Sequence, residues 1–178
     1  MILASGSPQR KAILEQLGVA FRVEVPELEE VVDGDAHEVV RENALLKARA
    51  VRGRTVLGAD TAVVLGGQTF GKPADEHAAG RFLRGFSGRT HEVMTGIAVV
   101  DRGAERSDVV VTRVRFRELD RGTLDWYLET GEWRDRAGGY AIQGKGAALV
   151  EAIEGDYFNV VGLPVAALLR LMPDLLRG

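Results

Sequence analysis

The chain has 178 residues, of which 46% are apolar and 28% are charged, the composition of a soluble globular domain that can bury a substantial core. The net charge of −3 argues against a protein that binds nucleic acid through a basic groove. The absence of cysteine excludes disulfides, zinc–thiolate sites and thiol nucleophiles, and the three histidines lack metal-ligand spacing.

No apolar run reaches the roughly 18 residues of a membrane span, and the N-terminal sequence MILASGS lacks the long apolar core of a signal peptide. We therefore expect a cytoplasmic protein with one domain over residues 1–178 and with neither a membrane nor a nucleic acid as partner. A metal bound here should be a hard, oxygen-ligated cation, with Mg²⁺ the first choice.

The predicted elements mix strands and helices without strict strand–helix alternation. Periodicity and turn residues first predict strand 2–4, helix 8–17, strand 21–25, acidic loop 26–34, helix 36–52 and strand 55–65. They then predict a hairpin turn at 66–67, helix 75–86, strands 91–100 and 108–116, helix 120–130, strand 147–153 and helix 163–176. This order favours an α/β fold with a mixed sheet over a doubly wound parallel one.

The start of the first helix is well capped but carries charges of the wrong sign. Ser7 suits the N-cap, Pro8 the first helical position and Gly18 the stop. Arg10 and Lys11 lie in the first turn, where cations oppose the helix dipole. A bound anion such as phosphate would resolve this conflict, and two solvated side chains are the equally weighted alternative.

Lysine is rare in this chain, with only four among 23 basic residues: Lys11, Lys47, Lys72 and Lys145. At about 100° per residue, Lys47 lies within about 20° of Val40 on the apolar side of its helix. An inward lysine must pair with a carboxylate, reach an anion, or lay its stem along the edge of the core. We expect Lys47 to face a cleft.

Asp60 interrupts the apolar strand VLGADTAVVL. A carboxylate among apolar neighbours needs a metal, a lysine or hydrogen bonds to offset desolvation. It can bind Mg²⁺ or act as a general base toward water. The alternative is an aspartate in a bulge or turn at a strand end, which Gly58 makes plausible.

Two stretches, 66–72 and 139–145, have the G-x-x-x-x-G-K spacing of a phosphate-binding P-loop. Each lacks the following Ser or Thr, and neither is predicted in a strand–loop–helix, so a P-loop NTPase is excluded. Pro73 still fixes the backbone directly after Lys72. In the second stretch Gln143 offers an amide that can donate and accept, as base recognition requires, although a simple glycine-rich turn is the alternative.

Eight segments in order carry a family resemblance: LASGSPQRKAIL, the pair Glu29-Glu30, ENALLKA, VLGADTAVV, GKPAD, FSGRTHEVMTG, GGYAIQGKGA and GDYFNVVGLP. Together they cover almost the whole chain and resemble the Maf family of nucleotide pyrophosphatases. The resemblance implies hydrolysis of a nucleoside triphosphate to the monophosphate and pyrophosphate. It also implies a homodimer of a Maf and inosine-triphosphatase-like fold, with an elongated twisted sheet, helices on both sides, two lobes and a central cleft.

The resemblance assigns roles to the charged residues. It implies that Asp60 is the general base and that Lys47, Lys72 and Glu29 line the cleft. Asp60 and Glu29 would also hold a divalent cation, Mg²⁺ or Mn²⁺, with the choice between Glu29 and Glu30 left open. Lysines and metal would stabilise the polyphosphate charge while Asp60 activates water.

The resemblance is to the subgroup that hydrolyses dTTP and UTP, and modified pyrimidine nucleotides are further expected substrates. It places Gln9, Thr61 and Gln143 at specificity positions and implies that the loop from Ser7 to Arg10 holds phosphate. The family usually reads S-P-R-R, so Gln9 removes a bidentate cation, which predicts weaker phosphate contact or relaxed substrate choice. The alternatives are a different base preference and a nucleotide-binding regulator of septum formation with little turnover. The strand carboxylate opposite inward lysines favours the enzyme.

Overall fold

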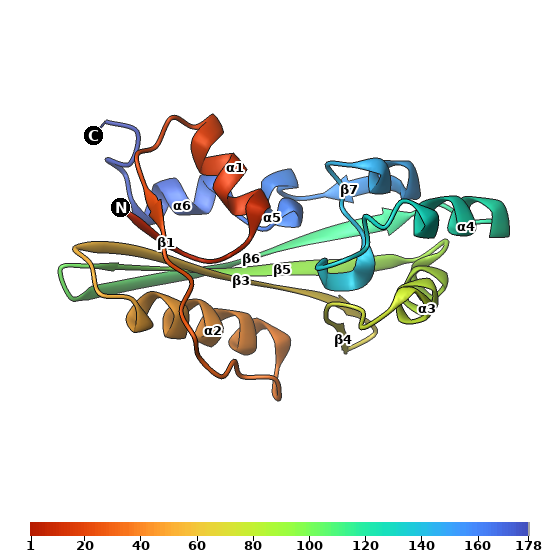
Figure 1. Cartoon of the computed structure of the whole chain (residues 1–178), viewed down its shortest axis with the longest axis horizontal. Coiled ribbons are helices and arrows are strands. Elements are labelled where there is room, and N and C mark those ends of the chain that lie inside the picture. Colours follow the sequence, from red (N-terminus) through yellow and green to blue (C-terminus); the bar gives the residue numbers. More distant parts are fainter. Residues whose placement is uncertain (178) are drawn as a thin grey trace. The chain divides into compact units, whose positions relative to one another are not determined.

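The computed structural model describes residues 1–177, which form two compact units (Figure 1). The first unit contains residues 1–61 and 94–110 and the C-terminal segment from residue 158, and the second contains residues 62–93 and 111–157. Strands β3 (Thr55–Leu65), β5 (Thr90–Asp101) and β6 (Ala104–Phe116) each contribute residues to both units. No helix in residues 1–177 has the length and apolar character that crossing a membrane requires.

A mixed sheet is the centre of the fold, as the sequence predicts. Within the described residues it has seven strands in the order β2-β1-β3-β5-β6-β7, with β4 (Gln68–Phe70) pairing with β3. Strand β1 (Ile2–Ala4) pairs in parallel with β2 (Arg22–Val23) and with β3. Strands β4 and β7 (Val150–Glu154) are antiparallel to their partners.

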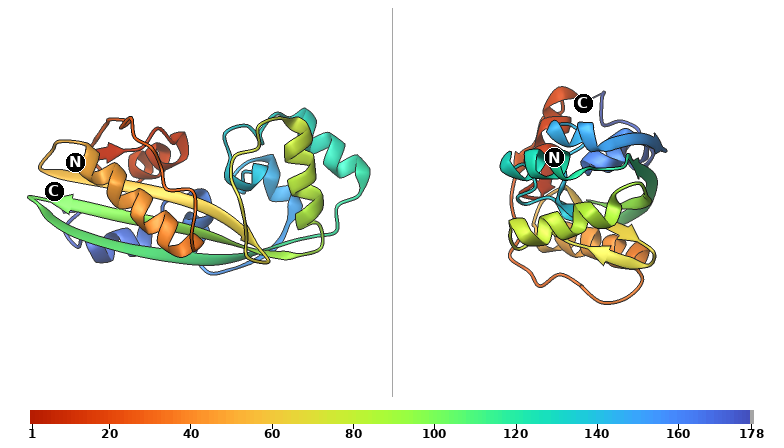
Figure 2. Two further views of the ribbon diagram at one scale, coloured as in Figure 1. Left: turned by 90° about the horizontal axis from the view of Figure 1, so that it is seen from below. Right: turned by 90° about the vertical axis from the view of Figure 1, so that its right-hand side faces the viewer.

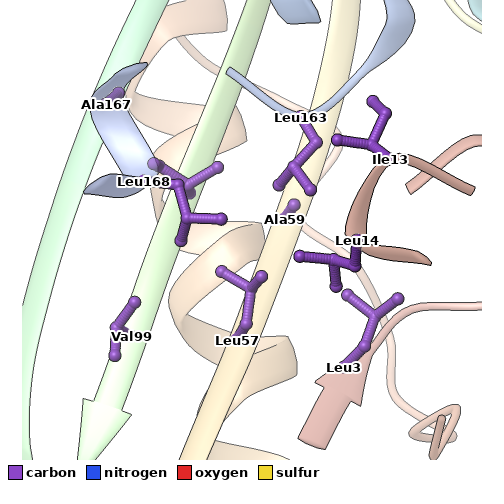
Figure 3. Close-up of a cluster of buried hydrophobic side chains, with 10 residues drawn as sticks. Leu3, Ile13, Leu14, Leu57, Ala59, Val99, Leu163, Ala167 and Leu168 are labelled. Atoms are coloured by element: carbon purple, nitrogen blue, oxygen red, sulfur yellow. The ribbon is translucent and has the colours of Figure 1, made fainter. Parts of the chain in front are cut away.

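In the first unit, helices cover both faces of the sheet. Helices α1 (Pro8–Gln16) and α6 (Val165–Leu171) lie on one face, and α2 (Ala36–Ala50) lies on the other (Figure 1). Because successive strand residues point to opposite faces, Leu57 and Ala59 pack against α1 and α6, whereas Val56 packs against α2. Figure 3 shows the first of these clusters.

Two strand glycines let α2 lie directly on the sheet. A Cβ at Gly58 would lie 2.1 Å from the Ala44 carbonyl oxygen, and one at Gly96 would lie 2.3 Å from the Val40 carbonyl oxygen. Both contacts are with helix backbone, which cannot move aside as a side chain does. The glycines therefore set the distance from α2 to β3, which carries Gly58, and to β5, which carries Gly96.

Replacing Gly58 with alanine should lower the free energy of unfolding by about 2 kcal/mol, because the added methyl group would force α2 off the sheet. Urea denaturation measures this change. Gly71→Ala is the matched control, since a Cβ at Gly71 meets nothing within 4 Å, and its effect should stay within about 0.5 kcal/mol. Equal losses from the two substitutions would contradict the packing argument.

In the second unit helix α3 (Glu76–Phe86) neighbours helix α4 (Arg121–Glu129) (Figure 2). Phe86 at the end of α3 belongs to an aromatic core. The His91 ring stacks on Phe86 with a centroid distance of 4.5 Å and meets Phe116 edge-on at 5.0 Å. His91 Nε2 lies 2.9 Å from the Tyr140 hydroxyl. Burial lowers the pKa of His91 to about 4, so the ring is neutral at physiological pH.

The buried His91 should make stability depend on pH. The unfolded chain protonates this histidine below pH 6.5, whereas the folded protein does so only near a pKa of about 4. The free energy of unfolding should therefore fall as pH is lowered from 6.5 toward 4, by up to about 3 kcal/mol from this residue. Urea denaturation at pH 7 and pH 4.5 should show a smaller difference for His91→Phe than for wild type. The exposed His77 provides the control, and a His77→Gln variant with the same reduced difference would refute the assignment.

Several predicted boundaries are wrong for identifiable reasons. The closing helix α6 ends at Leu171, because Met172 precedes Pro173 and a residue before proline disfavours the helical conformation. The predicted strand 147–153 begins only at Val150, because 145–149 form a short 3₁₀ helix whose first N–H groups donate to Glu132 rather than to a strand. Strand β2 has only two residues, and α2 ends at Ala50. Helix α5 (Tyr157–Val161) and the 3₁₀ turn Ala137–Gly139 were not predicted.

Candidate active site

Asp60 of β3 has both carboxylate oxygens engaged by donors from α2. Lys47 Nζ donates to Oδ1 at 2.8 Å, and Asn43 Nδ2 donates to Oδ2 at 3.1 Å. The side chains of Lys47 and Asp60 are only 12% and 17% exposed, so solvent screens this pair less than a surface ion pair. Lys47 and Asn43 lie four residues apart, so one face of α2 supplies both donors. The two contacts fix the plane of the carboxylate while leaving it partly accessible.

A second carboxylate reaches the same lysine. Lys47 Nζ lies 2.8 Å from Glu30 Oε1, and the Glu30 side chain is half exposed. Glu29, the carboxylate chosen from the sequence, is exposed beside it. The sequence left the choice between Glu29 and Glu30 open, and in the structure Glu30 is the one that contacts Lys47.

Asn43 holds the acidic loop in place, a role that the sequence did not reveal. Its Oδ1 accepts the Val31 N–H at 2.7 Å, and its Nδ2 donates to the Val31 carbonyl at 2.9 Å. The Asn43 side chain is almost completely buried. Because Val31 follows Glu30 directly, this clamp fixes the backbone that presents Glu30 to Lys47. The signal in the sequence that could have indicated this role was an asparagine one helical turn before a candidate lysine.

Arg10 points into the protein rather than into solvent. It is 8% exposed, and burial lowers its pKa, while the charges of Asp60 and Glu30 act in the opposite direction. Its guanidinium donates to four acceptors: Gly162 O at 2.8 Å, Ser5 Oγ at 2.8 Å, Ala59 O at 2.9 Å and Thr61 Oγ1 at 3.0 Å. Protein acceptors therefore offset the unfavourable position of this cation in the first turn of α1.

Two of these acceptors flank Asp60 in the chain. Arg10 binds the carbonyl of Ala59 and the hydroxyl of Thr61, so it fixes β3 on both sides of the carboxylate. Thr61 Oγ1 also lies 3.0 Å from Thr95 Oγ1, which donates to the Asn159 carbonyl. The Asn159 carbonyl is thus linked through Thr95 to Thr61, the residue after Asp60, and sequence patterns alone did not indicate this contact.

Ser7 caps α1 as predicted. Its Oγ accepts the Arg10 N–H at 3.5 Å and donates to Gln9 Oε1 at 3.1 Å. Lys11 instead lies on the solvent side, 3.6 Å from Glu15. At the start of α1 the side chains of Ser7 and Gln9 therefore lie together, whereas the Lys11 side chain pairs with Glu15 instead.

Seven of the nine predicted site residues lie in the first unit: Ser7, Gln9, Arg10, Glu29, Lys47, Asp60 and Thr61. Lys72 and Gln143 belong to the second unit, and both are exposed. Lys72 stands between Gly71 and the buried Pro73. The Gly71 carbonyl accepts the Gly138 N–H at 3.0 Å, which ties the Lys72 segment to the start of the glycine-rich loop that carries Gln143.

Residues 1–177 contain no group of three or more His, Asp or Glu side chains arranged to hold a metal ion. Asp60 and Glu30, however, both lie 2.8 Å from Lys47 Nζ, so two carboxylates converge on one cation. Mg²⁺ is commonly held by one or two carboxylates together with substrate phosphates and water. The donor set fits a cation that arrives with a polyphosphate substrate.

In this site a strand carboxylate is held by a lysine and an amide, and a second carboxylate contacts the same lysine. Such an arrangement suits a hydrolase that acts on phosphate esters or anhydrides. The comparisons with known proteins specify the family. Residues 1–175 match the family model described as Maf-like protein. The chain belongs to the Maf family.

Three curated relatives that match almost the full chain are named dTTP/UTP pyrophosphatase. The protein from Symbiobacterium thermophilum is 48% identical over 178 residues, covering 97% of this chain and 92% of the relative. The one from Deinococcus radiodurans is 47% identical over 177 residues, covering 97% and 91%. The one from Thermococcus kodakarensis is 46% identical over 178 residues, covering 96% and 94%.

Proposed function

We propose that this protein hydrolyses dTTP and UTP to the nucleoside monophosphate and pyrophosphate. The observation that carries the proposal is the convergence of Lys47 and Asn43 on the two oxygens of Asp60. Family membership over residues 1–175 and the consistent name of relatives with 46–48% identity give the reaction and the bases. The enzyme is thus a nucleoside triphosphate diphosphatase.

Asp60 acts as the general base in this proposal. A carboxylate fixed through both oxygens cannot rotate, so its free lone pairs keep one direction toward an attacking water. Lys47 adds a positive charge beside the site where charge develops on the polyphosphate. Lys72 supplies a further cation toward the phosphates, as the resemblance implies.

Asp60 and Glu30 would hold the divalent cation, Mg²⁺ or Mn²⁺. Bound there with substrate, such a cation would draw charge from the polyphosphate oxygens. The contact between Glu30 and Lys47 supports Glu30 as the second carboxylate. The role assigned to Glu29 from the sequence stays a prediction.

Substrate recognition is assigned to the polar side chains that the family resemblance implies. Ser7 and Gln9 at the start of α1 would meet phosphate, with Thr61 and Gln143 as further specificity residues. The donors of Arg10 are directed at four protein acceptors, so its proposed contribution is to position Asp60 and Thr61 rather than to bind phosphate. The homodimer and the cleft expected from the family resemblance stay predictions.

The decisive experiment is a measurement of products from a panel of dTTP, UTP, dCTP and dGTP with Mg²⁺, with Mn²⁺ and with EDTA. We expect pyrophosphate and the monophosphate from dTTP and UTP, and none with EDTA. Release of orthophosphate would refute the assigned bond. Tight nucleotide binding without turnover under every metal condition would favour the regulatory alternative.

A further inference from the structure

Glu132 ties down the glycine-rich loop, although the proposed mechanism does not use it. Its Oε1 accepts the Lys145 N–H at 3.0 Å, and its Oε2 accepts the Gly146 N–H at 2.9 Å. These donors follow Gln143 by two and three residues. One carboxylate therefore holds the backbone on the C-terminal side of Gln143 through two charge-assisted hydrogen bonds.

Gly144 makes this close approach possible. A Cβ at Gly144 would lie 2.2 Å from Glu132 Oε1. The carboxylate therefore occupies the space that a side chain at position 144 would need, which indicates that the loop is built around Glu132.

Tyr127 holds the other side of Gln143. Its hydroxyl accepts the Ala141 N–H at 3.2 Å, and the Ala141 carbonyl accepts the Gly144 N–H at 3.1 Å. Burial raises the pKa of Tyr127, and the charge of Glu132 adds to this increase, so the hydroxyl stays protonated. Gln143 itself is exposed at the tip of this turn. The exposed amide therefore sits on a backbone that is fixed before and after it.

We propose that Glu132 is a positioning residue for base selection, which fixes the direction of the Gln143 amide by binding the Lys145 and Gly146 N–H groups. This inference rests on the proposed function, in which Gln143 contacts the base. Glu132 itself touches no substrate. Its effect reaches the base only through the loop backbone.

The substitution Glu132→Gln tests this role with little change of shape. The amide keeps one acceptor oxygen and replaces the other with an NH₂ donor, so one loop N–H faces a second donor. The loop then gains conformations in which the Gln143 amide is misdirected. The pyrimidines differ at position 4, where the thymine or uracil carbonyl is an acceptor and the cytosine amino group is a donor. Discrimination between dTTP and dCTP is therefore the sensitive measurement.

We expect Glu132→Gln to lower the ratio of kcat/KM for dTTP to kcat/KM for dCTP by about tenfold, with KM for dTTP changing more than kcat. Gln143→Ala should lower the same ratio. The double variant should be no less selective than Gln143→Ala alone, because both changes remove one interaction. Glu151→Gln is the matched control, since Glu151 forms an exposed ion pair of 2.9 Å with Arg115 in the same unit, and its ratio should equal that of wild type.

Gly144→Ala provides a second route, because it displaces the loop from Glu132 without altering the carboxylate, and it should lower the ratio as Glu132→Gln does. Thermal melting of each variant separates loss of folding from loss of selectivity. The inference is overturned if Glu132→Gln lowers kcat/KM equally for both nucleotides, or if its effect on the ratio adds to that of Gln143→Ala. If the wild type releases pyrophosphate from neither dTTP nor UTP, the proposed function fails first and this inference falls with it.

Discussion

Asp60→Asn should lower kcat for pyrophosphate release from dTTP by about a thousandfold, the range expected for loss of a general base. The amide keeps the shape of the carboxylate but cannot accept a proton from water. It also places an NH₂ group toward Lys47 Nζ or Asn43 Nδ2, both of which donate to Asp60 in the wild type. The variant therefore loses the base and the alignment of the side chain together. Initial rates of pyrophosphate release measure the effect.

The control for Asp60→Asn is Asp108→Asn in the same unit, where the carboxylate makes a surface contact of 2.9 Å with Arg170. Its kcat should stay within about twofold of wild type, because a surface ion pair contributes little. Titration of each variant with nucleotide separates binding from chemistry. An Asp60→Asn enzyme with wild-type kcat would disprove the assignment of the base. A variant that binds nucleotide no better than background would make the main role of Asp60 binding rather than proton transfer.

Local sequence signals predicted much of the fold because capping and turn residues mark where the helices and strands begin and end. Strand β3 has its predicted bounds, Thr55–Leu65, because a largely apolar stretch, interrupted at Asp60-Thr61, continues up to the turn at Gly66-Gly67. Asp75 and Asp120 cap α3 and α4 through their side chains. The failures lie where a distant partner decides the local structure. The chain at Lys145 turns into a 3₁₀ helix because of Glu132, and no local pattern encodes that contact.

The same division applies to the candidate site. Helical periodicity correctly predicted that Lys47 points inward, because the direction of a side chain on a helix depends only on its position. The selection of Glu30 over Glu29 for this lysine depends on how Asn43 grips Val31, a contact across 12 residues of loop and helix. The inward path of Arg10 likewise depends on acceptors up to 152 residues away in the chain. Helical periodicity predicts the direction of a side chain, whereas its contact partners are known only from the folded structure.

Arg10→Met should lower the free energy of unfolding by about 4 kcal/mol, because it removes the only guanidinium that serves four largely buried acceptors within the first unit. Methionine fills much of the volume, so the loss reflects unpaired carbonyls and hydroxyls more than a cavity. Urea denaturation measures it. The matched control is Arg170→Met, which breaks only an exposed pair with Asp108 and should cost less than about 1 kcal/mol.

Arg10→Lys separates the charge of Arg10 from its geometry. An ammonium keeps the positive charge near Asp60, but its single nitrogen cannot replace three guanidinium nitrogens that reach Gly162, Ala59 and Thr61 in different directions. We therefore expect Arg10→Lys to recover only part of the stability and to keep a reduced kcat, since β3 on both sides of Asp60 is no longer fixed. Activity is measured well below the melting temperature, so that every molecule counted is folded. If Arg10→Lys matches the wild type in both stability and kcat, charge alone suffices, and the fork of hydrogen bonds around Asp60 has no part in positioning the base.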